Sequence, residues 1–180
     1  MKTSSFGTVW RALLAMLLLA AAYPAQAEKL TFDHRLYPPL KEVLDSGDAG
    51  MIAYDASNPR YVIDLIAIRG KSASDWSEAL EIIARTPAKS LRSARDWFDE
   101  LRRGADRRCA NTFTMLAEGP ASLTFERRSP DCPAERAGTE ITRVLAGKRS
   151  LFRITFLFKG VPDESARQQA LALLASAHLE

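Results

Sequence analysis

Residues 151–158 read LFRITFLF, and this stretch decides the fold. Its even-numbered positions are all apolar, whereas Arg153 and Thr155 interrupt the odd-numbered ones. Because successive side chains of a β-strand point to opposite faces of a sheet, the alternation predicts a strand with one continuous apolar face. That face consists of Phe152, Ile154, Phe156 and Phe158.

The segment after this strand predicts a helix that can cover the apolar face. Pro162 suits the first turn of a helix, where a missing backbone N–H leaves no hydrogen bond unmade. Beyond it, small and apolar residues recur at helical spacing, so we expect them to form one stripe against the sheet. The stripe consists of Ala166, Ala170, Leu173, Leu174 and Ala177.

Three further strands are predicted before residue 151. Apolar residues alternate with Thr and Ser in residues 112–115 and 122–126, and Gly119-Pro120 lies between these two runs, as is typical of a hairpin. Residues 141–146 predict a third, less regular strand. In the hairpin we expect Phe113 to pair with Phe125.

The N-terminal half predicts a second hairpin, formed by residues 51–54 and 61–68. Apolar residues at spacings of four and three then predict a helix over 74–85. A second helix is predicted over 90–103, with Gly104 as its C-terminal cap.

Together these elements predict one α+β domain over residues 28–180. We expect an antiparallel sheet of four to six strands, packed against helices on one side and stapled by a single disulfide. Before the sheet, Pro38-Pro39 predicts an interruption of regular structure, followed by a short amphipathic piece at 40–44.

Residues 1–27 have the pattern of a secretory signal peptide. Lys2 and Arg11 precede an apolar run, and Ala25 and Ala27 are small residues of the kind that signal peptidase accepts. The run is too short to span a bilayer. We therefore expect cleavage after Ala27 and a periplasmic or extracellular bacterial protein without a transmembrane anchor.

Composition excludes several classes of protein. The chain has 180 residues, 47% of them hydrophobic, which excludes intrinsic disorder and a collagen-like fibre. Its 25 Lys+Arg stand against 22 Asp+Glu. Because Lys2 and Arg11 belong to the leader, the remaining body is nearly neutral, which disfavours a nucleic-acid partner.

The two cysteines, Cys109 and Cys132, predict a structural disulfide in an oxidising compartment. The expected hairpin register sets Cys109 opposite Ser129, and the proline at position 130 lets the chain bend back toward it. Reactive or metal-binding thiols are the alternative. They are disfavoured because no Cys-x-x-Cys pair and no nearby histidine accompanies them.

The search for catalytic chemistry yields no candidate residues. His34 beside Asp33 is a pair that arises easily by chance, and we expect His178 to lie at the end of the last helix, where its charge suits the dipole. Phosphate loops, nucleophile elbows and zinc-binding helices are missing from the sequence. We therefore assign no catalytic residue, no metal ligand and no cofactor.

Charge is distributed unevenly, which suggests a partner surface. Residues 85–108 carry eight bases and four acids, and residues 127–153 carry seven bases and three acids. A solvated surface is the alternative, because helical i,i+4 pairs such as Arg92 with Asp96 compensate part of this charge. The candidate partner surface consists of Arg102, Arg103, Arg107, Arg108, Arg127 and Arg128.

Three functions remain open. The preferred hypothesis is a non-catalytic envelope protein, inhibitor-like or immunity-like, that binds a protein or another envelope macromolecule, including an anionic one. The alternative is a carrier of a small apolar ligand between sheet and helix, and an unrecognised hydrolase ranks third. The residues that would line the carrier's cavity are Phe113, Phe125, Phe152, Ile154, Phe156 and Trp97.

Overall fold

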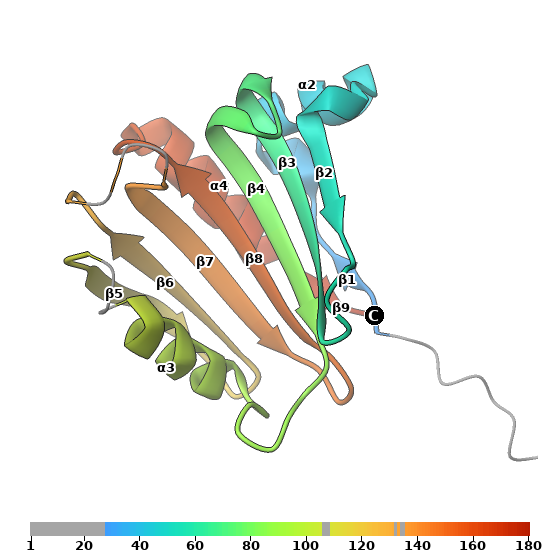
Figure 1. The fold of residues 1–180 in the computed structure, drawn as a ribbon, viewed down its shortest axis with the longest axis vertical. Helices are drawn as coiled ribbons and strands as arrows, with labels where there is room; N and C mark the ends of the chain where they lie inside the picture. Colours follow the sequence, from blue (N-terminus) through green and yellow to red (C-terminus); the bar gives the residue numbers. More distant parts are fainter. Residues whose placement is uncertain (1–27, 106–108, 132, 134–135) are drawn as a thin grey trace, which may run out of the picture.

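A computed structural model describes residues 28–105, 109–131, 133 and 136–180. Within this part of the chain, seven strands form one antiparallel sheet in the order β2-β3-β4-β8-β7-β6-β5 (Figure 1). The strands are β2 (Ile52–Asp55), β3 (Tyr61–Ser72), β4 (Asp75–Arg85), β5 (Thr112–Glu118), β6 (Ser122–Arg128), β7 (Thr139–Ala146) and β8 (Leu151–Phe158).

A second, two-stranded sheet joins the two ends of the described chain. Its strands are β1 (Leu30–Thr31) and β9 (His178–Leu179), which pair antiparallel. Lys29 and Glu180 continue this pairing, since each backbone N–H donates to the carbonyl of the other residue. The sequence predicts His178 at the end of the last helix. That prediction is wrong, because His178 lies in the strand β9.

Helices cover both faces of the seven-stranded sheet. The helix α4 (Glu164–Ser176) lies behind the sheet in Figure 1, and α3 (Ala94–Ala105) lies in front. The helix α2 (Pro38–Ser46) lies at the top of the view and contacts β3. The two short 3-10 helices are η1 (His34–Leu36) and η2 (Ala49–Met51). No helix in the described ranges is long and apolar enough to cross a bilayer.

The alternation in β8 divides the core into two parts, as the opening stretch of sequence predicts. Its even-numbered residues pack with Leu173 and Leu174 of α4. On the other face, Leu151 packs with Trp97 and Phe98 of α3. The predicted helical stripe over the β8 face is confirmed, because Ala170, Leu173, Leu174 and Ala177 belong to the same buried cluster as Phe152 and Phe156.

The predicted fold class was wrong in two respects. The described part of the chain is mostly sheet, with seven strands in the large sheet where four to six were expected. Its helices lie on both faces and not on one. The predicted disulfide between Cys109 and Cys132 stays a prediction, because Cys132 lies outside the described residues.

The largest local error concerns residues 74–85, which form the strand β4 and not a helix. Strand β4 lies between β3 and β8 and contributes to the core on both faces: Leu80 and Ile82 pack toward α4, whereas Ile83 packs toward α3. A strand buried on both faces shows no polar–apolar alternation. The prediction of a helix was wrong because β4 contains adjacent apolar pairs, Ala79-Leu80 and Ile82-Ile83, whose spacing also fits a helix.

Two other predictions fail for local reasons. Pro38 and Pro39 occupy the first turn of α2 and start it, so they do not interrupt regular structure. Gly104 does not cap α3, because the helix continues to Ala105, which is buried.

The hairpin of β5 and β6 forms with a register shifted by two residues from the expected one. Phe113 pairs with Arg127, and Met115 pairs with Phe125. The side chains keep their predicted faces because a shift of two residues preserves parity.

Candidate functional site

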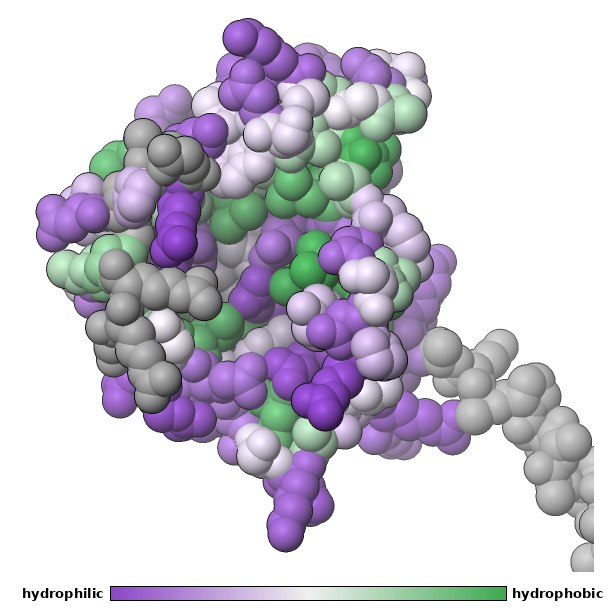
Figure 2. All heavy atoms as spheres, in the orientation of Figure 1, coloured by the Kyte–Doolittle hydropathy of each residue, from purple (hydrophilic) through white to green (hydrophobic). Residues whose placement is uncertain are grey.

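A groove lies on the α3 face of the sheet, where α3 covers only part of the strands. Its volume is about 560 Å³. Figure 2 shows this face hollowed, with hydrophilic residues at the centre of the hollow. We call it the central groove; its principal lining residues are Trp76, Glu81, Leu101, Ala105, Arg127, Arg136, Glu140 and Arg153.

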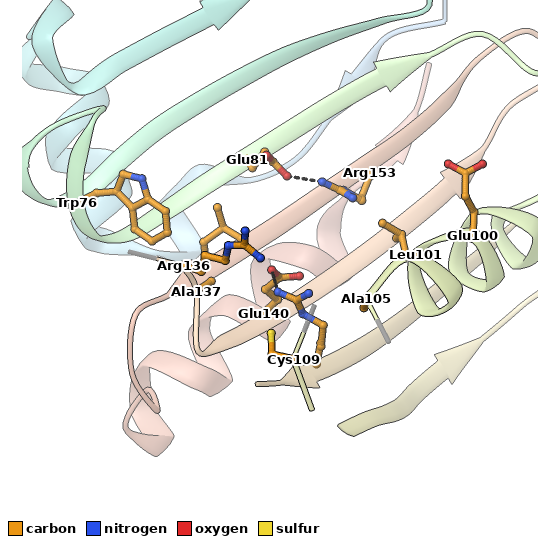
Figure 3. Close-up of a pocket in the computed structure, with 13 residues that line it drawn as sticks. Trp76, Glu81, Glu100, Leu101, Ala105, Cys109, Arg136, Ala137, Glu140 and Arg153 are labelled. Atoms are coloured by element: carbon orange, nitrogen blue, oxygen red, sulfur yellow. Dashed lines mark hydrogen bonds and ion pairs between the residues drawn. The ribbon is translucent and has the colours of Figure 1, made fainter. Parts of the chain in front are cut away.

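Four charged side chains from four neighbouring strands form the floor of the central groove. Glu140 of β7 and Arg127 of β6 are direct cross-strand partners and form an ion pair. Arg153 of β8 forms an ion pair with Glu81 of β4 (Figure 3). All four side chains are about one-fifth exposed, so these charges are largely removed from water yet remain reachable from the groove.

The side of the groove toward α3 is held by a second set of charged and aromatic contacts. Arg85 Nη1 donates to Glu100 Oε1 at 2.9 Å. The guanidinium groups of Arg85 and Arg153 lie 5.3 and 5.9 Å from the ring centroid of Trp97. Such cation–π contacts fix α3 against the charged floor.

Glu140 has a perturbed pKa. Burial raises the pKa of its carboxyl above the ordinary value, and the positive charges of Arg127 and Arg153 oppose that rise only in part. Raised carboxyl pKa values are frequent at functional sites, because such sites hold charge away from water. Burial also raises the pKa of Asp64, which does not line the groove, so the shift at Glu140 supports the site only together with its geometry.

The rim of the groove is more open than its floor. Trp76 stands across from Leu101 and Ala105 of α3 in Figure 3. Arg136 is exposed and makes no ion pair with any described residue. The groove thus combines a charge-compensated floor, apolar walls and, at the rim, Arg136, which has no ion-pair partner among the described residues.

The structure does not gather the predicted partner surface in one place. Arg102 and Arg103 are exposed on α3, whereas Arg107 and Arg108 lie outside the described residues. Arg127 and Arg128 follow each other in β6 and point to opposite faces. Arg127 enters the central groove, while Arg128 binds Glu126, which also binds Arg167 of α4.

The residues expected to line a carrier cavity also separate between the two faces. Phe152, Ile154 and Phe156 are buried toward α4. Trp97, Phe113 and Phe125 pack together under α3. Because the sheet lies between the two groups, they form two parts of the core and not one cavity.

The histidines lie away from the groove. Asp33 does not orient His34, because both of its carboxylate oxygens accept hydrogen bonds from Arg35. His178 Nδ1 lies 2.9 Å from the carbonyl oxygen of Ser176. Within the described ranges, no three His, Cys, Asp or Glu side chains cluster as a metal site would require.

Sequence reasoning missed Trp76, Glu81, Glu140 and Arg153 as groove residues. A signal for two of them was present, since Arg153 and Glu81 are charged residues inside strongly apolar stretches. A charged residue is rarely buried unless it is paired. Comparison of the chain with protein-family models and with curated proteins gives no match.

Proposed function

We propose that the chain is an exported, non-catalytic protein of the bacterial cell envelope that binds another macromolecule through the central groove. The observation that carries this proposal is the groove itself: an open hollow of about 560 Å³ over a compensated floor of two ion pairs. Glu81 and Glu140 are each held by an arginine, an arrangement that suits recognition better than proton transfer.

The rim supports a protein as the partner. Trp and Arg are the residues that most often dominate the binding energy of protein interfaces, and Trp76 and Arg136 lie on the same side of this rim in Figure 3. An inhibitor-like or immunity-like protein would use such a surface. The charge of Arg136, which no described acidic residue pairs, favours an acidic segment of the partner.

Export rests on the leader, residues 1–27, which lies outside the described residues. The mass of the protein recovered from the periplasmic or extracellular fraction should correspond to a chain that begins at Glu28. Recovery of the intact chain from the cytosol would contradict export.

The groove is tested by reversing its rim charge. Arg136→Glu should weaken capture of the partner from a detergent-solubilised envelope extract by roughly tenfold, as expected for a lost interface arginine. Arg60→Glu is the matched control, because Arg60 is exposed in the turn before β3, far along the sheet from Arg136. Equal capture by both variants, with unchanged melting temperatures, would refute the groove as the binding surface.

A carrier of a small amphipathic ligand is the second candidate function. The volume of the groove lies within the range of ligand pockets, and Leu101 and Ala105 provide an apolar wall above the charged floor. Native mass spectrometry of the protein purified from its own envelope should then show a retained small molecule. If the Arg136→Glu variant still retains the small molecule but no longer captures the protein, the result would favour the macromolecular partner.

A further inference from the structure

A second hollow lies at the end of the sheet where β4 ends and β7 turns into β8, at the bottom of Figure 1. Two loops form it: the connection from β4 to α3 and the turn at 147–150. The hollow has a volume of about 520 Å³. Its lining consists of Pro87, Ala88, Lys89, Arg92, Gly147 and Lys148.

The charged side chains that line this hollow are basic. Lys89, Arg92 and Lys148 line it, and Arg149 follows in the same turn. All four are exposed, and none forms an ion pair within the described part of the chain. We call these four residues the basic end. The two basic segments of the sequence, 85–108 and 127–153, meet here.

Two acidic groups at the basic end accept hydrogen bonds from the backbone of its loops. The Glu28 carboxylate accepts the N–H groups of Lys148, Arg149 and Ser150 at 2.6, 3.0 and 2.9 Å. Asp96 Oδ2 accepts those of Arg92 and Ser93, both at 2.9 Å. Both loops therefore already hold a carboxylate through backbone donors, and the charges of Arg149 and Arg92 also act on these carboxylates. Lys89 and Lys148 form no ion pair with any described residue.

The field at this end favours negative charge. Hydrogen bonds from the backbone of Arg149 and its neighbours hold the pKa of Glu28 below its ordinary value, although partial burial opposes this. The pKa of Asp96 is lowered by the same kind of contact from Arg92. Four like charges around one hollow repel one another, and an anion bound between them would relieve that repulsion.

We propose that Lys89, Arg92, Lys148 and Arg149 form a binding site for a phosphate group or a comparable oxyanion of a ligand. Lysine and arginine ammonium and guanidinium groups are the donors that proteins use for phosphate oxygens. The site is separate from the central groove, whose arginines are mostly paired with glutamates, so it does not depend on the function proposed for that groove.

The site is tested with two probes that carry the same chemistry. Pyrophosphate is titrated by calorimetry at low and moderate salt, and vesicles of phosphatidylglycerol with phosphatidylcholine are tested by cosedimentation against phosphatidylcholine alone. The variant Lys89→Glu with Lys148→Glu should lower the affinity for the bound probe by about tenfold or more, because two charge-assisted contacts become repulsive.

The matched control carries the same change of net charge at the opposite end of the sheet. Lys41→Glu with Lys71→Glu alters exposed lysines of α2 and β3, whose surface ion pairs with Asp45 and Asp75 contribute little to stability. It should bind like the unaltered protein. The milder variant Lys89→Gln with Lys148→Gln should show an intermediate loss, which keeps the test valid if the charge reversal impairs folding.

Each outcome decides the proposal. If the unaltered protein binds pyrophosphate and the variant Lys89→Glu with Lys148→Glu does not, the result supports a discrete phosphate site. If the unaltered protein binds only the anionic vesicles and the same variant loses that binding, the phosphate belongs to a lipid headgroup. Binding of neither probe overturns the proposal. Equal loss in the control variant also overturns it, because the effect would then reflect overall charge.

Discussion

Glu126 is the most deeply buried carboxylate that bridges two parts of this fold. It is 4% exposed, on β6, and accepts hydrogen bonds from Arg128 Nε and from Arg167 Nε of α4. Burial raises the pKa of Glu126, but hydrogen bonds from both arginines outweigh it, and the pKa lies below the ordinary value. The residue therefore ties α4 to the sheet in its charged form.

Glu126→Gln should lower the free energy of unfolding at neutral pH by about 2 kcal/mol, because one arginine loses its acceptor in a buried site. A lowered carboxyl pKa contributes stability above the ordinary pKa, and this contribution is lost as the pH falls through the folded-state value. The difference between the variant and the unaltered protein should therefore shrink toward pH 3. Urea unfolding at both pH values measures it; a constant difference would contradict the assigned linkage.

The candidate site could be predicted only in part, for reasons that individual residues make clear. Arg127 was identified as functional, but it was grouped with Arg128. Consecutive residues of a strand face opposite sides, so this grouping could have been rejected once 122–126 was extended as a strand. The ion pairs of Arg127 with Glu140 and of Arg153 with Glu81 depend on strand order, which the sequence does not display.

At the scale of elements, the β7–β8 turn is fixed by a residue distant in sequence. Glu28 caps its three N–H groups, and Gly147 leaves room for the carboxylate: a side chain at 147 would overlap the Glu28 oxygens. Gly147 has no positive φ, so alanine suits its backbone. Any loss of stability on substitution of Gly147 must therefore come from displacement of the Glu28 carboxylate from the turn.

Gly147→Ala and Glu28→Ala should each lower the free energy of unfolding by about 1 kcal/mol, the typical value of a lost side-chain cap. In the Glu28→Ala background, Gly147→Ala should leave the free energy of unfolding almost unchanged, because the Glu28 carboxylate that the new methyl group would displace is already missing. Thermal or urea unfolding of the four proteins completes this double-mutant cycle. Additive effects would show that Gly147 serves another purpose.

The hairpin between β3 and β4 depends on Gly70. Its φ is 137°, in the region that favours glycine, and a Cβ there would lie 2.5 Å from Trp76 Cα. Gly70→Ala should lower the free energy of unfolding by about 2 kcal/mol or more, because neither the backbone angle nor the neighbouring backbone can adapt cheaply.

Gly104→Ala is the matched control for Gly70→Ala, since a Cβ at Gly104 meets no described atom within 4 Å and the residue lies in α3. It should be neutral or stabilising, as alanine is favoured in helices. Equal melting temperatures for the two variants would disprove the strain assigned to Gly70.

At the scale of the whole molecule, the pairing of β1 with β9 holds the two ends of the described chain together. Leu30 and Leu179 pack against the core on the α4 face, and the backbones of Lys29 and Glu180 exchange hydrogen bonds of 3.1 and 3.0 Å. The small sheet also places Glu28 where it can reach the β7–β8 turn. The pairing of β1 with β9 therefore helps to hold the β7–β8 turn through Glu28.

Deletion of residues 178–180 should lower the melting temperature by roughly 5 °C, equivalent to about 2 kcal/mol for a protein of this size. It removes β9 and releases β1 from the core. Glu180→Ala is the control, because it retains the backbone hydrogen bonds of residue 180 and should melt within about 1 °C of the unaltered protein. Unchanged melting of the truncated chain would show that β1 holds without its partner.

By itself, the sequence determined the elements whose two faces differ. The alternation of LFRITFLF fixed β8 and its covering helix, because one face of that strand is fully apolar and only a nearby stripe of α4 can bury it. The tertiary structure alone decided that residues 75–85 form β4, since a strand covered on both faces carries no alternation. It alone also decided which charges meet, because the central groove and the basic end join residues from strands and loops far apart in the chain.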